Sequence, residues 1–184
     1  PALDESVYPG RCRECGHAES EAALRVNVGN GTEQIDDLFR GSLHCEMNRE
    51  VGDFVVRRKD GQFSYQLACA VDEAAQRITD VVRGADLVAS SFRQAWLSHR
   101  LGLPHLRYAH LPLLAGPDGH KLSKQNGATA IRKDQATAQL SQALALLGQS
   151  LPVDAADMKV SEILNWAIGH WHPERVPLGP LKIA

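Results

Sequence analysis

The sequence lacks the features of membrane proteins, secreted proteins and proteins with a general affinity for nucleic acids. No apolar run approaches the roughly 18 residues of a transmembrane helix, and the N-terminus is too polar for a signal peptide. The net charge of −2 provides no overall basic field, so any contact with RNA or phosphate must come from local patches. Four cysteines, at positions 12, 15, 45 and 69, do not have the spacing of a secreted disulfide framework. We therefore expect a cytoplasmic globular protein.

Internal repeats and low-complexity segments are also absent, and the chain begins with Pro1 rather than with methionine. Its 184 residues are 43% hydrophobic and 23% charged, which is ordinary for a globular domain that buries a core without disulfides or metals. The missing methionine leads us to expect a fragment of a longer protein.

Alternating or apolar stretches predict strands, and amphipathic stretches rich in Ala and Leu predict helices. Strands are expected at 24–28, 53–58, 63–73, 77–87 and 108–114, and helices at 91–100, 134–148 and 159–170. Ser91 and Gln94 have the S-x-x-Q spacing of a capping box, and Gly148 is a stop signal for the second helix. The last dozen residues contain three prolines and are expected to be irregular. This order of elements predicts an α/β core followed by a helical C-terminal region.

The stretch "GPDGHKLSKQNGA" (116–128) combines a turn signal with two lysines three positions apart. Its Pro-Asp-Gly sequence (117–119) favours a tight turn, because Pro presets φ and Gly tolerates positive φ. Lys121 and Lys124, with Ser123 between them, then place flexible ammonium groups where they could bind phosphate oxygens or stabilise a leaving pyrophosphate. A solvated dibasic turn is the alternative interpretation.

Arg83 follows an apolar strand and precedes Gly84, so its charge needs an acceptor. It could hold a substrate carboxylate through two parallel hydrogen bonds, or it could form a structural salt bridge with Asp72 or Asp86. Tyr65, in a strand expected to be half-buried, could offer its hydroxyl to the same ligand. The alternative for Tyr65 is a core tyrosine whose hydroxyl reaches water.

The N-terminal stretch "CRECGH" (12–17) has the C-x-x-C spacing of half a zinc site, with a histidine nearby. Tyr8, Cys12, Cys15 and His17 form this cluster, and a closed site needs more ligands than the cluster supplies. Free surface cysteines are the alternative.

Two further groups of residues have less distinctive patterns. Arg57, Arg58 and Lys59 form a basic hairpin tip, which could contact a phosphate backbone or could be a solvated turn. The histidines at 105, 110, 170 and 172 have no metal-binding spacing and are expected to be packing or surface residues.

Taken together, residues 53–128 resemble the second half of the catalytic domain of glutamyl-tRNA synthetases, a class I family with a Rossmann-type adenylation fold. The resemblance is dense from about residue 50 to 130, and the order and spacing of the segments make it specific. "KLSKQ" (121–125) is similar to the lysine-serine-lysine loop that stabilises the ATP phosphates in that family. "FSYQLA" (63–68) and "VVRGADL" (81–87) are similar to its glutamate-binding stretches.

A shorter paralogous group, the glutamyl-queuosine tRNA(Asp) synthetases, resembles the sequence more closely. "YPGRC" (8–12) looks like the Tyr-x-x-x-Cys half of the group's zinc site, and "VSEILNWAIGHWHPERVPLG" (160–179) looks like its C-terminal end. The chain also stops about 60 residues after the lysine loop, where a glutamyl-tRNA synthetase continues into an anticodon-binding domain. The resemblance implies activation of glutamate with ATP and transfer of the glutamyl group to queuosine in the anticodon loop of tRNA(Asp).

The same resemblance implies roles for individual residues. Tyr65 and Arg83 bind glutamate, and Lys124 contacts ATP, which is used with Mg²⁺. Lys121 and Ser123 shape the loop around Lys124. In a second site, Tyr8 and Cys12 bind zinc with ligands upstream of Pro1, and Cys15 falls outside the pattern.

The resemblance also implies a division of the chain into three segments. Residues 1–20 end a zinc-binding segment, 21–132 form the second half of the catalytic domain with an inserted acceptor-type subdomain, and 133–184 form a helical region. We expect a monomer that does not contact a membrane.

The main departure from the family is that its first ATP signature, with its histidines, has no counterpart in this sequence. We therefore expect the chain alone to be inactive. Two alternatives stay open for the function: a minimal glutamyl-tRNA synthetase that charges a tRNA 3′ end, and a non-catalytic tRNA-binding paralogue.

Overall fold

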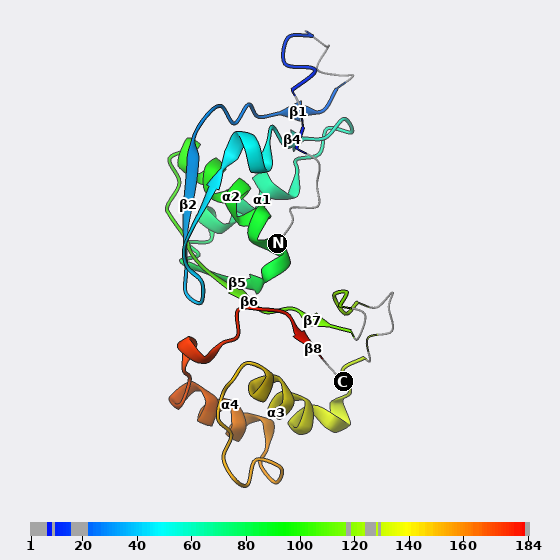
Figure 1. The fold of residues 1–184 in the computed structure, drawn as a ribbon, viewed down its shortest axis with the longest axis vertical. Coiled ribbons are helices and arrows are strands. Elements are labelled where there is room, and N and C mark those ends of the chain that lie inside the picture. The colour runs from blue at the N-terminus through cyan, green and yellow to red at the C-terminus, as the bar shows by residue number, and fades with distance from the viewer. Residues whose placement is uncertain are drawn as a thin grey trace. The chain divides into compact units, whose positions relative to one another are not determined.

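The computed structural model describes residues 7–8, 10–15, 22–116, 119–123, 128 and 130–182. The chain divides into two compact units, residues 1–110 and 111–184 (Figure 1). No helix among the described residues is long and apolar enough to cross a membrane.

A four-stranded sheet forms the centre of the first unit. Its strands are β2 (Thr32–Asp37), β3 (Gly41–Glu46), β5 (Asp80–Gly84) and β6 (Arg107–Leu111), in the order β3-β2-β6-β5. The antiparallel hairpin β2–β3 pairs with β6 through a parallel contact that sets Asp37 opposite Tyr108. The end of β2 thereby meets the beginning of β6, although the two segments are far apart in the sequence.

Two helices and a small ribbon complete this unit. Helix α2 (Val88–Arg100) packs on β2 and also against α1 (Tyr65–Ala75) (Figure 1). Strands β1 (Leu24–Arg25) and β4 (Val55–Arg57) pair antiparallel, and short helical turns cover Met47–Val51 and Ala85–Leu87. The core includes Phe54 and Trp96, whose rings meet edge to face with centroids 6.0 Å apart.

The hairpin β2–β3 was not predicted, because its first strand, "TEQIDD", has few apolar residues. Burial nevertheless alternates along β2, and its inward positions are Glu33, Ile35 and Asp37. Two of these three inward side chains are carboxylates, so the usual apolar signal of a half-buried strand is missing.

The strand predicted at 63–73 is wrong, because this segment forms α1. Ser64 caps the helix by accepting a hydrogen bond from the backbone N–H of Leu67 at 3.4 Å. The alternation at the start of the segment suggested a strand, but Leu67, Ala70 and Ala74 recur at helical spacing. Tyr65 is consequently the first residue of a helix and not part of a half-buried strand.

The predicted capping box of Ser91 and Gln94 is also wrong. Both residues lie inside α2, which begins at Val88, and both side chains are fully buried. The predicted strand at 24–28 is shorter than expected, because the N–H of Val28 is bound by the Asp53 side chain, at 3.2 Å, and not by a neighbouring strand.

The second unit contains two predicted helices, α3 (Ala136–Leu146) and α4 (Val160–Gly169), which pack against each other. Short helical turns cover Lys133–Gln135 and Pro173–Arg175, and β7 (Leu114–Ala115) pairs parallel with β8 (Leu181–Lys182). Beyond α3, the buried amide of Gln149 accepts the N–H of His172 at 2.9 Å and donates to its carbonyl at 3.1 Å. The Gln149 side chain therefore links the end of α3 to the proline-rich C-terminal segment.

Gly148 ends α3, as the sequence predicted. Its φ of +73° lies in the left-handed region, and a Cβ built there would come within 2.4 Å of the Arg175 carbonyl oxygen. Both the backbone conformation and the close approach of the C-terminal segment require glycine.

We predict that Gly148→Ala lowers the free energy of unfolding by about 1–3 kcal/mol, because a left-handed non-glycine residue is strained. Urea unfolding followed by tryptophan fluorescence measures the change. Gly179→Ala is the matched control, since that glycine has no atom within 4 Å of a built Cβ and no positive φ. Equal stability of the two variants would contradict the prediction.

Candidate functional site

Arg83 lies near the end of β5 with a half-buried side chain. Its Nη2 donates a hydrogen bond to Ser91 Oγ at 2.5 Å, and its guanidinium lies 5.4 Å from the centroid of the Tyr108 ring. Its Nε is buried and has no hydrogen-bond partner among the described residues. The arginine therefore retains a buried donor for a ligand.

Tyr65 is near Arg83, at the start of α1, and is 55% exposed. The pKa of the Tyr65 phenol is raised, first by a hydrogen bond with the Cys69 side chain one turn later, whereas the charge of Arg83 acts to lower it. The two residues that the sequence analysis assigned to one ligand therefore lie within electrostatic range of each other. The Cys69 side chain is half-buried.

Two polar side chains were missed by the sequence analysis: Gln94, which is fully buried, and Glu73, which is half-buried. Burial raises the pKa of the Glu73 carboxyl, the charge of Arg83 acts to lower it, and Glu73 Oε2 has no partner among the described residues. Gln94 donates from Nε2 to Gln66 Oε1 at 3.1 Å, while its own Oε1 lacks a partner in the same part of the chain. The sequence offered no signal for either residue, because a polar residue in a helix is unremarkable until its burial is known.

The donors and acceptors of this group are complementary to an amino acid. Arg83 Nε offers a charged donor for a carboxylate, and the Tyr65 hydroxyl is accessible beside it. Glu73 Oε2 and Gln94 Oε1 offer acceptors for an ammonium group. Buried polar atoms without hydrogen bonds are costly for the fold. A ligand with a carboxylate and an ammonium group would supply the missing partners.

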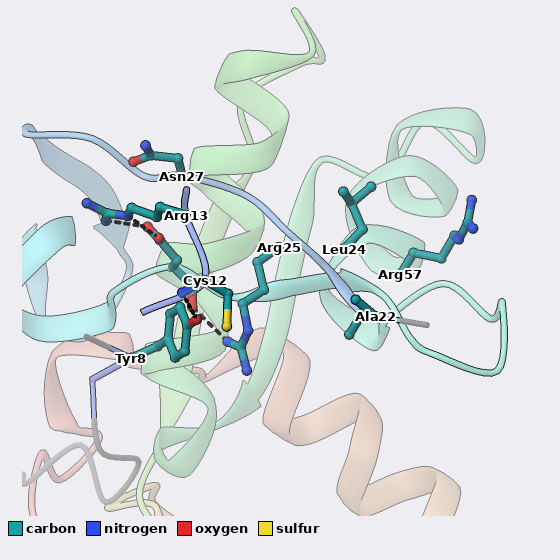
Figure 2. A pocket seen from close by; sticks show the side chains of 10 residues that line it. Tyr8, Cys12, Arg13, Ala22, Leu24, Arg25, Asn27 and Arg57 are labelled. Atoms are coloured by element: carbon teal, nitrogen blue, oxygen red, sulfur yellow. Dashed lines mark hydrogen bonds and ion pairs between the residues drawn. The ribbon is translucent and has the colours of Figure 1, made fainter. Parts of the chain in front are cut away.

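A second candidate site contains Tyr8 and Cys12, which line a pocket of about 370 Å³ (Figure 2). The Tyr8 hydroxyl accepts the backbone N–H of Cys12 at 2.9 Å, and the Arg25 guanidinium lies 4.2 Å from the centroid of the tyrosine ring. The pKa of Tyr8 is raised, first by a hydrogen bond with the Cys12 side chain. The two predicted zinc ligands are therefore in contact.

These residues fit half of a tetrahedral zinc site, which needs four ligands. Among the described residues, no group of three or more His, Cys, Asp or Glu side chains could hold a metal ion. Cys15 donates from Sγ to the carbonyl of Arg11 at 3.3 Å, which agrees with its place outside the family pattern. His17 lies outside the described residues.

Asp53 anchors the segment that carries Cys12. Its carboxylate accepts two hydrogen bonds from Arg13, at 2.6 and 2.8 Å, and one from the N–H of Val28 at 3.2 Å. Asp53 is 3% exposed, and the hydrogen bond from Arg13 is the main cause that lowers the pKa of its carboxyl. This buried acceptor joins the N-terminal segment to the β1–β4 ribbon.

The lysine loop belongs to the second unit. An isolated bridge pairs Lys121 antiparallel with Ala115 of β7, and the N–H of Leu122 donates to the Leu114 carbonyl at 2.8 Å. Gly119 has a φ of +79°, as the predicted turn requires, although Pro117 and Asp118 lie outside the described residues. Lys124 also lies outside them, so its predicted role stays a prediction, as do those of Lys121 and Ser123.

The predicted basic hairpin tip, residues 57–59, leads from β4 into a turn. Within this turn, Arg58 forms an exposed salt bridge with Asp60 at 2.7 Å. Among the four unassigned histidines, His110 is fully buried in β6 and hydrogen-bonded on both ring nitrogens.

Comparison with known proteins identifies the class. The family described as tRNA synthetases class I (E and Q), catalytic domain, matches residues 7–163. The chain belongs to this family, and the predicted Rossmann-type α/β fold of class I synthetases is confirmed.

Within this class, the chain is 46% identical over 173 residues to a glutamyl-Q tRNA(Asp) synthetase of Pseudomonas syringae pv. tomato. It is also 46% identical over 171 residues to one of Pseudomonas aeruginosa. These alignments cover 94% and 93% of this chain but 59% and 58% of the relatives. The chain therefore spans about three fifths of the length of the curated relatives that it matches.

A solved structure of the glutamate-tRNA synthetase from Elizabethkingia anophelis has the same fold, with a TM-score of 0.71 at 21% identity. That alignment covers 97% of this chain and 42% of the other.

We predict that Asp53→Asn lowers the free energy of unfolding by about 1–3 kcal/mol near neutral pH, because it removes a charged acceptor. The folded-state pKa of Asp53 is depressed below 3.8, so its contribution is present in full above about pH 4–5 and is lost as the pH falls through the folded value. Urea unfolding at several pH values should show the gap between the two proteins closing below pH 4.

Asp60→Asn is the matched control, because the Arg58–Asp60 pair is exposed and contributes less than about 1 kcal/mol. A loss as large in Asp60→Asn, or a gap for Asp53→Asn that is insensitive to acid, would count against the role of Asp53.

Proposed function

We propose that the protein activates glutamate with ATP and transfers the glutamyl group to the queuosine base in the anticodon of tRNA(Asp). The observation that carries this proposal is the 46% identity, over 94% of the chain, to a relative named glutamyl-Q tRNA(Asp) synthetase. The buried donor of Arg83 and the acceptors of Glu73 and Gln94 support an amino acid as one substrate.

In the proposed reaction, a carboxylate oxygen of glutamate attacks the α-phosphorus of ATP and pyrophosphate leaves. A hydroxyl of the queuosine base then attacks the acyl carbon of the adenylate and AMP leaves. Tyr65 and Arg83 hold the amino acid during both steps. Lys124, in the loop shaped by Lys121 and Ser123, stabilises the negative charge that develops on the phosphates, together with Mg²⁺ bound to ATP.

The proposal keeps the division into segments 1–20, 21–132 and 133–184 and places the protein in the cytoplasm as a monomer. In this division the lysine loop lies near the end of the catalytic segment, and helices α3 and α4 follow that segment.

The test supplies the full-length gene product with ATP and labelled glutamate, together with tRNA(Asp) that carries or lacks queuosine, and with tRNA(Glu). We expect label only on queuosine-bearing tRNA(Asp), and we expect it to survive removal of the 3′ adenosine. Label on tRNA(Glu) that is lost with that adenosine would instead indicate a minimal glutamyl-tRNA synthetase. The absence of glutamate activation would indicate a non-catalytic paralogue.

Two lysine variants control this assay. Lys124→Ala should lower the rate of ATP–pyrophosphate exchange by about 100-fold, the order expected when one electrostatic donor to a developing charge is lost. Lys133→Ala changes an exposed lysine of the second unit and should leave the rate unchanged.

We also propose that Tyr8 and Cys12 supply two of four donors to a zinc ion, whose remaining ligands precede Pro1. The contact between the two side chains and the donor types support this proposal. Such an ion would tie the N-terminal segment to the first unit and would not take part in the reaction.

The metal content of the full-length gene product tests this site. Cys12→Ser should lose about one zinc per chain, because a hydroxyl replaces a thiolate ligand. Cys15→Ser should retain the metal, since the Cys15 thiol is bonded to a backbone carbonyl. Retention of zinc in Cys12→Ser would reject the assignment.

A further inference from the structure

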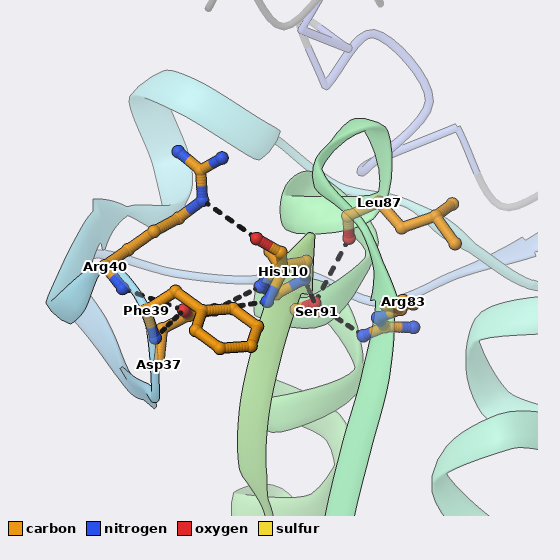
Figure 3. Close-up of polar contacts among 7 residues, drawn as sticks. All are labelled: Asp37, Phe39, Arg40, Arg83, Leu87, Ser91 and His110. Carbon is orange, nitrogen blue, oxygen red and sulfur yellow. Dashed lines mark hydrogen bonds and ion pairs between the residues drawn. The ribbon is translucent and has the colours of Figure 1, made fainter. Parts of the chain in front are cut away.

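A chain of hydrogen bonds runs from Arg83 through Ser91 and His110 to Asp37 (Figure 3). Arg83 Nη2 donates to Ser91 Oγ at 2.5 Å, and Ser91 Oγ lies 2.7 Å from His110 Nε2. His110 Nδ1 lies 2.5 Å from Asp37 Oδ2. The four residues come from β5, α2, β6 and β2, so the hydrogen bonds connect three strands of the sheet with the helix α2.

The Asp37 end of this chain is held rigidly. Asp37 Oδ1 accepts the backbone N–H groups of Phe39 and Arg40 at 2.9 and 3.0 Å, and Oδ2 accepts the N–H of His110 at 3.0 Å (Figure 3). Arg40 Nε in turn reaches the His110 carbonyl, at 3.4 Å. With these donors around it, the buried carboxylate has both of its oxygens hydrogen-bonded.

The direction of each hydrogen bond follows from Asp37. A carboxylate only accepts, so His110 Nδ1 carries the proton. Burial lowers the pKa of His110 despite the opposing effect of Asp37, so the ring is neutral and Nε2 accepts. Ser91 then donates its proton to Nε2 at 2.7 Å, with the Leu87 carbonyl as a second and longer acceptor at 3.1 Å, and its oxygen presents lone pairs to Arg83. Every donor in the chain points toward Asp37, an arrangement in which neighbouring hydrogen bonds strengthen one another.

Ser91, His110 and Asp37 have the connectivity of a hydrolase triad, but they cannot act as one. Ser91 and His110 are 0% exposed, so an acyl carbon cannot reach the serine oxygen. The Ser91 oxygen is also occupied by Arg83 and lies 3.1 Å from the Leu87 carbonyl. The chain is therefore suited to hold a partner and not to attack a substrate.

We propose that Asp37, His110 and Ser91 position the guanidinium of Arg83 for substrate binding. Fixing Nη2 on Ser91 limits rotation of the guanidinium plane, while the buried Nε has no hydrogen-bond partner among the described residues. A preorganised donor binds a carboxylate without the entropy cost of immobilising a long side chain. This inference rests on the proposed function, because it takes glutamate as the ligand of Arg83.

Ser91→Ala tests the proposal in the full-length gene product by ATP–pyrophosphate exchange. We expect the KM for glutamate to rise about tenfold or more, because a hydrogen bond to a charged group is lost. The KM for ATP and kcat should stay within about twofold, since the loss falls on ground-state binding of one substrate. Ser98→Ala is the matched control, since Ser98 is a buried serine of the same helix outside the chain.

A double-mutant cycle with Arg83→Lys separates positioning from general packing. If Ser91 acts through Arg83, Ser91→Ala should add little to the KM for glutamate in the Arg83→Lys background. Additive effects, an unchanged KM for glutamate in Ser91→Ala, or equal effects of Ser91→Ala and Ser98→Ala would overturn the proposal.

His110→Asn is the second variant, for use if Ser91→Ala does not fold. An asparagine amide can still donate to Asp37 but cannot reach Ser91, so the same selective rise in KM for glutamate is expected. An unchanged KM in this variant would overturn the proposal. If the unaltered protein does not activate glutamate at all, the proposed function and this inference fall together, whereas normal activation with an unaffected Ser91→Ala rejects the inference alone.

Discussion

The first unit depends on the burial of one carboxylate. Asp37 is 5% exposed, and a buried carboxylate is stable only when its oxygens are hydrogen-bonded or paired. Both oxygens obtain their donors from the turn after β2 and from His110, so β2 and β6 must stand side by side for the charge to be tolerated. Through Ser91 the same group also fixes α2 and, beyond it, Arg83. The four-stranded sheet, helix α2 and Arg83 therefore all depend on providing hydrogen-bond donors to the Asp37 carboxylate.

Local patterns in the sequence predicted much of the secondary structure. The apolar run before Arg83 and the amphipathic stretches of α3 and α4 each carry enough periodicity to be recognised alone. Local reasoning failed where tertiary contacts decide the outcome. The hairpin β2–β3 has carboxylates at its inward positions, and their burial is explained only by partners elsewhere in the chain. In α1, a brief alternation around Phe63 and Tyr65 concealed the helical spacing of the residues that follow.

The same distinction applies to the candidate site. Arg83 could be selected from sequence because a charge at the end of an apolar strand demands an acceptor. Tyr8 and Cys12 were selected because "YPGRC" resembles half of a family zinc site, whereas the C-x-x-C spacing alone pointed to Cys12 and Cys15. Gln94 and Glu73 could not be selected, because a polar residue in a helix is unremarkable until its burial is known. The link between His110 and Asp37 spans 73 positions, and no local pattern connects them.

That span has a consequence for biosynthesis. A ribosome releases the chain from its N-terminus, so Asp37 emerges long before His110. Until residue 110 has left the exit tunnel, β2 has a charged inward side chain with no partner on β6, and the sheet cannot close. The first unit should therefore fold late and cooperatively, when its last strand arrives, and nascent chains that stop before that strand should remain open to chaperones and proteases.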